Sequence, residues 1–77
     1  MINWKEYIVS NPQIMYGKPV IKNTRVCVEL ILEKLAEGET IPSILEGYPH
    51  LKQESIYACL AYAMDSVKNE TIYSLAS

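Results

Sequence analysis

The sequence predicts a small, mainly α-helical domain with a short β element near its N-terminus. Three observations predict this fold. From residue 28 onward, apolar residues recur at helical spacing in three segments, which Gly38, Gly47 and Pro49 separate. Before residue 28, β-branched residues flank a short polar turn. The chain has 77 residues, 49% hydrophobic and 21% charged, which is the composition of one folded domain rather than a disordered chain.

Residues 1–19 predict an irregular arm. Asn3 has the side chain of a helix N-cap, so we expect a single helical turn through residues 4–7. Residues 8–9, Ile-Val, favour a short extended segment. The arm breaks at Asn11-Pro12, because the residue before a proline avoids helical conformation.

Residues 20–28 predict a hairpin. A polar turn separates two groups of β-branched residues: Val20 and Ile21 before it, and Val26 and Val28 after it. Asn23, in the turn, tolerates the left-handed backbone conformation that a tight turn requires. We therefore expect the two groups to pair as a small ribbon around the turn.

Helical spacing begins at residue 28. In the first helical segment, apolar residues follow the spacing i, i+3, i+4, i+7 and i+8: Val28, Ile31, Leu32, Leu35 and Ala36. Gly38 is the expected C-terminal stop. Thr40 is the expected N-cap of a second, shorter helix, in which Pro42 is tolerated in the first turn. Gly47 and Pro49 end that helix.

A third and longest helix is expected to begin near Lys52 or Gln53. Its expected inward residues are Ile56, Cys59, Leu60, Ala63 and Val67. The chain is thus divided into an arm and hairpin (1–27), a three-helix core (28–68) and a tail (69–77). This order of helices and turns predicts a single trihelical helix-turn-helix domain, homeodomain-like or winged-helix-like.

The composition argues against several classes of protein. Cys27 and Cys59 are too few for the disulfide framework of a secreted mini-protein, so we expect buried, reduced thiols and a cytoplasmic location. The longest apolar stretch, residues 58–64, is too short to cross a bilayer. His50 has no metal-ligand spacing to another residue, and the glycines stand singly. We therefore expect no enzyme, no metal and no cofactor.

Five short motifs occur together and in order along the chain: GKP at 17–19, TR at 24–25, LAEG at 35–38, ILEGYPHL at 44–51 and LAYA at 60–63. In this respect the chain resembles the domain of unknown function 433 family, over residues 7–63. The resemblance implies an antitoxin-like component of a type II toxin–antitoxin pair. Such a protein binds a PIN-like ribonuclease toxin and represses its own operon by binding double-stranded DNA through the helix-turn-helix.

Two positions depart from the pattern of that family. Asn23 stands where the family usually has glycine, a mild change because both residues accept positive φ. Lys52 stands where the family usually starts the third helix with threonine or serine. Lysine has no side-chain oxygen for a cap, and its charge lies at the positive end of the helix dipole. It offers a phosphate contact instead, so we hypothesise that the lost cap is tied to function.

Basic residues are concentrated around the predicted turn. Residues 16–25 carry a net charge of +3 and the whole chain carries −2, so the remainder carries −5. The expected nucleic-acid-binding residues lie in this turn region and at the start of the third helix: Lys18, Lys22, Asn23, Thr24, Arg25, Lys52 and Gln53. The competing interpretation is a solvated edge in which Arg25 pairs with a helix glutamate such as Glu29.

One copy has too few cations to hold DNA strongly, so we expect a homodimer. Joining the ribbon edges of two copies would bury Val20, Ile21 and Val26 and pool the cations on one face. Tyr57 and Tyr62, on the outward side of the third helix, more often complete a core or a dimer face than contact DNA.

The tail, residues 69–77, offers apolar anchors for a toxin: Ile72, Tyr73 and Leu75. Alternatively, the tail extends the third helix and packs on the same or a second subunit. A different class of function also fits the sequence. It is a dimerisation or scaffold module that binds only protein and no DNA, which the acidic net charge of −2 favours.

Overall fold

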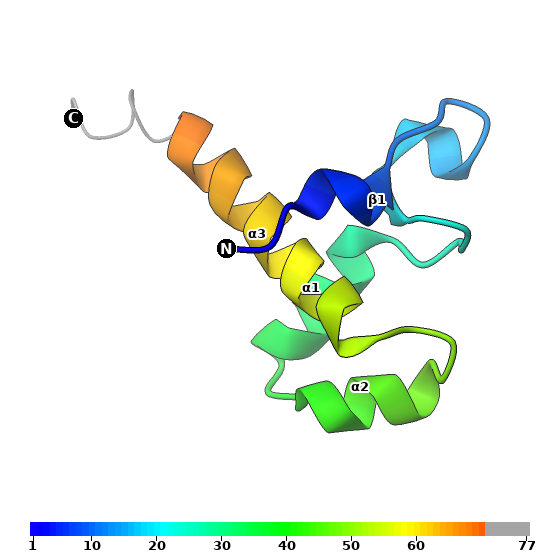
Figure 1. The fold of residues 1–77 in the computed structure, drawn as a ribbon, viewed down its shortest axis with the longest axis vertical. Coiled ribbons are helices and arrows are strands. Elements are labelled where there is room, and N and C mark those ends of the chain that lie inside the picture. Colours follow the sequence, from blue (N-terminus) through cyan, green and yellow to red (C-terminus); the bar gives the residue numbers. More distant parts are fainter. Residues whose placement is uncertain (71–77) are drawn as a thin grey trace.

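The computed structural model describes residues 1–70 of the chain (Figure 1). The elements within this range, in order, are the 3₁₀ helix η1 (Trp4–Glu6), strand β1 (Ile8–Val9), the 3₁₀ helix η2 (Met15–Gly17), strand β2 (Val20–Ile21) and the helices α1 (Val28–Ala36), α2 (Ile41–Gly47) and α3 (Gln53–Glu70). Helix α3 contacts η1, α1 and α2. The predicted mainly α-helical fold with a small N-terminal β element is confirmed. The tail residues Ile72, Tyr73 and Leu75 lie outside the described residues.

Strands β1 and β2 form an antiparallel ribbon. Ile8 lies opposite Ile21, and Val9 lies opposite Val20. Ile8 and Ile21 are buried, so one face of the ribbon packs on the core. In Figure 1 the ribbon and η1 lie on one side of α3, and α2 lies at the far end of the molecule. The extended segment predicted for residues 8–9 is therefore confirmed.

The hairpin predicted within residues 20–28 is only partly present. The turn forms, with Asn23 in the left-handed region at φ 65°. After the turn, the described chain makes a single bridge, between Val20 and Cys27, in place of a second strand. The chain has no length for a strand there because α1 begins at Val28. The strand partner of β2 is β1 instead.

Helices α1 and α2 begin and end where the sequence predicts. After α1, Gly38 has φ 95°, a backbone conformation that favours glycine. The Glu39 N–H donates to the Lys34 carbonyl (3.0 Å), which closes the helix. The Oγ1 atom of Thr40 accepts the Ser43 N–H (3.2 Å) and caps α2.

Helix α3 begins at Gln53, so Lys52 occupies its N-cap position. The Lys52 N–H donates to Oγ of Ser55 (3.3 Å), and the Ser55 N–H donates to the Lys52 carbonyl (2.9 Å). The third residue of the helix therefore satisfies the backbone of the cap, but lysine has no oxygen with which to complete a reciprocal capping box. Ser55 is buried, so its hydroxyl is shielded from water.

The core is built on one face of α3. Its fully buried isoleucine and cysteine side chains come from three helices: Ile31, Ile44, Ile56 and Cys59. Burial raises the pKa of the Cys59 thiol to about 12, so this cysteine stays protonated. Tyr62 packs edge-on against Trp4 with ring centroids 4.8 Å apart. The Trp4 Nε1 atom also donates to Oδ2 of Asp65 (2.7 Å), which holds η1 against α3.

Two residues expected to face the core are on the surface instead. Leu60 is 42% exposed and Val67 is 57% exposed. Apolar residues of α3 follow two overlapping stripes, and helical periodicity does not distinguish the stripe that faces the core. The stripe of Ile56 and Cys59 is the one that faces the core. Next to it on α3, Trp4 of η1 packs on Tyr62.

The predicted dimer through the ribbon edges does not fit the burial of the ribbon. Val20, Ile21 and Val26 are only 1%, 4% and 8% exposed within one copy. A second copy therefore has almost no apolar area left to bury at these side chains. Burial of these side chains would therefore add little to such a dimer, and the homodimer stays a prediction.

The described residues contain no helix that is both long and apolar enough to span a membrane. The same residues hold no group of three or more His, Cys, Asp and Glu side chains placed to bind a metal ion. Cys27 is half-buried and Cys59 is buried, and both are free thiols.

Two glycines provide a matched test of the fold. A Cβ atom would meet nothing within 4 Å at either Gly38 or Gly47, so the two sites differ in backbone conformation rather than in space. We expect Gly38→Ala to lower the free energy of unfolding by about 1–2 kcal/mol, because φ is positive there. We expect Gly47→Ala to raise it by about 0.4–1 kcal/mol. Urea denaturation followed by circular dichroism measures both values, and equal effects would contradict the left-handed end of α1.

Candidate nucleic-acid interface

A hollow of about 360 Å³ lies between the turn after β2 and the N-terminus of α3. We call it the turn–helix hollow. It is lined by residues far apart in sequence: Glu6, Tyr7, Ile21, Lys22, Asn23, Thr24, His50, Leu51, Lys52 and Ser55. The fold thus brings together residues that the sequence nominated for nucleic-acid binding at two separate places: Lys22, Asn23 and Thr24 in the turn, and Lys52 at the helix.

The turn is fixed by its own hydrogen bonds. The Thr24 N–H and the Thr24 Oγ1 both reach the Ile21 carbonyl, at 3.0 and 2.7 Å. The same Oγ1 accepts the Val26 N–H (3.0 Å). Because the Thr24 hydroxyl already serves as donor and acceptor, its part in the site is to hold the turn that presents Lys22. A contact from Thr24 to nucleic acid stays a prediction.

Arg25 lies on the other side of the same turn. It lines a second hollow, also of about 360 Å³, that shares Lys22, Asn23 and Thr24 with the turn–helix hollow. The turn is therefore a ridge between two recesses, with Lys52 on one side and Arg25 on the other. A polyanion that lies across this ridge can contact cations from both recesses.

Lys18 is placed apart from this group. Its Nζ atom lies 3.2 Å from Oε1 of Glu29 in the first turn of α1, and both side chains are largely exposed. The competing interpretation paired Glu29 with Arg25, whereas the structure pairs it with Lys18. An exposed ion pair of this kind contributes little to stability, so Lys18 stays able to exchange Glu29 for a phosphate.

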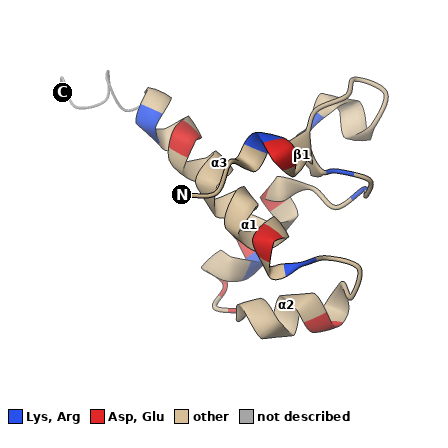
Figure 2. Ribbon diagram, viewed as in Figure 1, with Lys and Arg blue, Asp and Glu red and all other residues tan. Residues whose placement is uncertain are grey.

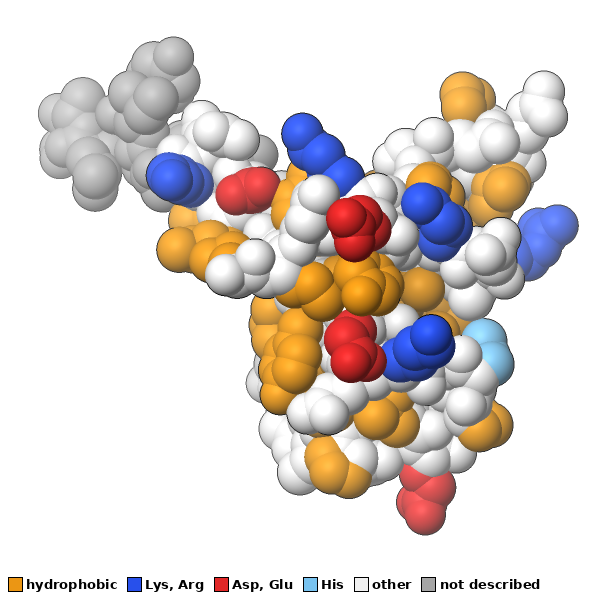
Figure 3. Space-filling model, viewed as in Figure 1, with side chains coloured by type: hydrophobic (Ala, Val, Ile, Leu, Met, Phe, Trp, Pro, Cys, Tyr) orange, Lys and Arg blue, Asp and Glu red, His pale blue; other side chains and the backbone are white. Residues whose placement is uncertain are grey.

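Lys22, Arg25 and Lys52 are exposed, and none of them has an acidic group within salt-bridge distance among residues 1–70. Acidic residues are nevertheless close at hand, since Glu6 lines the turn–helix hollow and Glu54 lies in the first turn of α3. Figures 2 and 3 show basic and acidic residues interspersed rather than a continuous basic surface. The basic residues of one copy are therefore few and lie among acidic ones.

The outward side chains of α3 are partly occupied within the helix. The Gln53 Nε2 atom donates to the Tyr57 hydroxyl (2.9 Å), so base contact by Gln53 requires that this bond break. Tyr62 packs on Trp4, which agrees with the interpretation of this tyrosine as a core residue. Tyr57 is 42% exposed and is therefore less buried than Tyr62.

One exposed feature was not anticipated from the sequence. Met15, Tyr16 and Gly17 have φ of 52°, 59° and 82°, so η2 is a left-handed turn that includes two non-glycine residues. Tyr16 is 98% exposed on this turn. Left-handed backbone costs non-glycine residues about 1–2 kcal/mol each, and such strain is often kept at functional positions. The only sequence signal was a glycine after a tyrosine, which is too common to single out.

A family model matches most of the chain. The model of the family described as "Protein of unknown function (DUF433)" matches residues 8–63. The chain belongs to the DUF433 family. The match covers β1 to the middle of α3 and therefore includes both sides of the turn–helix hollow. The family resemblance stated from the sequence is confirmed, and the family description names no activity.

A relative of this DUF433 chain is the uncharacterized protein y4eO of Sinorhizobium fredii (strain NBRC 101917 / NGR234). The two are 36% identical over 59 residues, which cover 77% of this chain and 27% of y4eO. The chain thus spans about a quarter of the length of this curated relative. No solved structure matches the chain significantly.

The N-cap of α3 gives a prediction that separates stability from binding. Lys52→Ser places a side-chain oxygen at the cap and completes the capping box with Ser55. We expect the free energy of unfolding to rise by about 0.5–2 kcal/mol. Gln53→Ser, one residue later, offers no cap and should lower it slightly. Thermal denaturation of the two variants checks this, and a Lys52→Ser protein less stable than the parent would contradict it.

Proposed function

We propose that this DUF433 protein is an antitoxin-like component of a type II toxin–antitoxin pair. In this proposal a dimer binds operator DNA through the ridge and the N-terminus of α3, and another surface binds a PIN-like ribonuclease toxin. The observation that carries the DNA-binding part is the convergence of Lys22 and Lys52 on one hollow. The toxin-binding part rests on the resemblance of the family to antitoxins.

The arrangement suits the backbone of DNA better than its bases. Lys22, Arg25 and Lys52, which form no salt bridge within the described part of the chain, lie around a ridge made of backbone turn. Phosphate contacts from such cations position a protein without reading sequence. The N-terminus of α3 adds the positive end of a helix dipole beside Lys52. Sequence readout is assigned to Gln53, whose amide can bond adenine once it leaves Tyr57.

The missing side-chain cap of α3 supports the same proposal. A serine or threonine at residue 52 would stabilise the helix, yet this chain has a lysine there. The lysine loses the cap and gains an exposed ammonium at the mouth of the turn–helix hollow. Departures from local rules of stability are expected at functional sites, and this departure adds a phosphate contact.

Binding to the DNA upstream of the protein's own reading frame tests the proposal. If a dimer contacts phosphates with Lys22, Arg25 and Lys52 of both copies, log Kd should change with log salt with a slope of about 5. Lys22→Gln or Lys52→Gln removes two of these contacts per dimer, so each should reduce the slope by about 2. Fluorescence anisotropy between low and physiological salt measures these slopes.

A control variant distinguishes the site from general charge. Lys5→Gln removes the same charge from an exposed lysine of η1 that lines neither hollow. It should leave the slope close to that of the parent protein. Equal losses for Lys5→Gln and Lys52→Gln, or no binding at low salt, would reject the DNA-binding part. The second outcome favours the alternative function, a protein-binding scaffold module without DNA binding.

Toxin binding is assigned to the exposed left-handed turn as well as to the predicted tail anchors. Tyr16 is a large aromatic side chain held out of contact with the rest of the domain, which is typical of an interface anchor. Tyr16→Ala should therefore weaken binding to the ribonuclease encoded next to this protein by about tenfold or more, at unchanged thermal stability. Isothermal titration calorimetry with the purified toxin measures this affinity.

A second variant separates the two candidate anchors. Removal of residues 71–77 deletes Ile72, Tyr73 and Leu75 and leaves Tyr16 in place. If only the truncated protein loses affinity, the tail is the toxin anchor and Tyr16 is not. If neither variant changes the affinity, the toxin binds elsewhere or this chain is not an antitoxin.

A further inference from the structure

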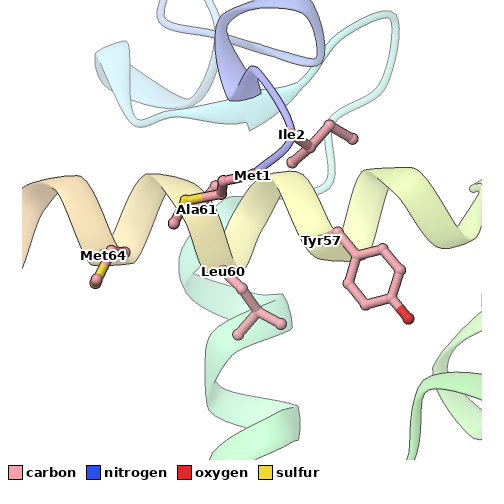
Figure 4. Close-up of a pocket in the computed structure, with 6 residues that line it drawn as sticks. All are labelled: Met1, Ile2, Tyr57, Leu60, Ala61 and Met64. Atoms are coloured by element: carbon pink, nitrogen blue, oxygen red, sulfur yellow. The ribbon is translucent and has the colours of Figure 1, made fainter.

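Helix α3 carries an apolar face that the described fold does not cover. Tyr57 and Leu60 are each 42% exposed, Met64 is 52% exposed and Val67 is 57% exposed. Figure 4 shows Tyr57, Leu60 and Met64 projecting from the same side of the helix. Beside them is a hollow of about 390 Å³, lined by Met1, Ile2, Tyr57, Leu60, Ala61 and Met64. Large exposed apolar surfaces of this kind mark interaction sites.

The spacing along this face indicates what kind of partner fits it. Tyr57, Leu60, Met64 and Val67 are separated by three, four and three residues. This alternation is that of the a and d positions of a heptad, which form a narrow seam for packing against another helix. We call these four residues the α3 seam. The seam is distinct from the core stripe of Ile56 and Cys59, so both faces can be occupied together.

We propose that the α3 seam binds the α3 seam of a second copy of this chain, in antiparallel orientation about a twofold axis. With the axis midway along the seam, Leu60 lies opposite Met64 of the second copy, and Tyr57 lies opposite Val67 of the second copy. Every seam residue then meets an apolar residue. The hollow beside Leu60 and Met64 receives an apolar side chain of the second copy, as a hole receives a knob.

The charges that flank the seam support a second copy in this orientation. Glu54 and Lys68 occupy equivalent heptad positions on the same side of the seam, two heptads apart. In the antiparallel pair, Glu54 of each copy lies opposite Lys68 of the other. Opposite charges meet twice by symmetry. In a parallel pair in register, the e positions of one helix face the g positions of the other, so Glu54 and Lys68 would not meet. The small residues Ala61 and Ala63 flank the centre and allow the helices to approach closely.

This dimer also affects how the turn–helix hollows are placed, a consequence that rests on the proposed DNA binding. Lys52 lies outside the α3 seam and stays exposed when the seam is covered. It precedes the centre of the seam by ten residues, or about 15 Å of helix, so the two copies of Lys52 lie about 30 Å apart along the helix axes. One turn of B-DNA is about 34 Å, which matches two adjacent half-sites.

Sedimentation equilibrium of the full chain without DNA or toxin tests the dimer itself. We expect a monomer–dimer equilibrium, and Leu60→Glu should raise its dissociation constant by at least about tenfold because it places a carboxylate in the seam of each copy. Met15→Glu, the same type of change at an exposed apolar residue of η2, should leave the equilibrium unchanged. Circular dichroism verifies that both variants are folded.

Charge exchange tests the orientation. Glu54→Lys alone places two lysines opposite each other and should weaken the dimer several-fold, as should Lys68→Glu alone. The double variant Glu54→Lys with Lys68→Glu should restore the affinity of the parent.

A monomeric parent protein, an unchanged dimer in Leu60→Glu, or no restoration in the double variant would overturn the proposal. If Leu60→Glu stays dimeric but no longer binds the toxin, the seam belongs to the toxin. DNA binding is measured separately, so it can fail without affecting this result.

Discussion

The packing of the inner face of α3 is the interaction on which the rest of the described structure depends. Ile56 and Cys59 of this face are completely buried, and α3 contacts η1, α1 and α2. A chain of this size buries only about 60% of its unfolded surface, so it has few alternative contacts with which to hold its elements together. The same packing fixes the N-terminus of α3 beside the ribbon, and this is why Lys52 and Lys22 line the same hollow.

The departures from ideal local structure are found at the surface around this contact. Asn23, Met15 and Tyr16 adopt left-handed backbone, and Lys52 takes the cap position without an oxygen to offer. The left-handed backbone of Met15 and Tyr16 and the missing cap oxygen at Lys52 each cost stability, whereas asparagine accepts positive φ at little cost. Two of them, Asn23 and Lys52, line the turn–helix hollow. This placement supports the proposed DNA binding.

The parts of the fold that depend on local signals were predictable from the sequence, and the long-range parts were not. Gly38 and Thr40 define the ends of α1 and α2 through backbone conformation and capping, which act within a few residues. The pairing of β2 with β1 instead of with the chain after the turn is a tertiary choice. Likewise, the sequence predicted Lys22 and Lys52 as separate binding residues, and only the packing of the fold brings them to one hollow. The same packing leaves Leu60 exposed.

The proposed DNA binding requires that the turn after β2 and the N-terminus of α3 act as one surface. The most direct measurement is a titration of isotope-labelled protein with its own upstream DNA, followed by amide chemical shifts in NMR. We predict that the largest changes occur together at residues 22–25 and 50–53, at the same DNA concentration. Changes confined to α1 and α2, or changes in only one of the two segments, would contradict a shared surface.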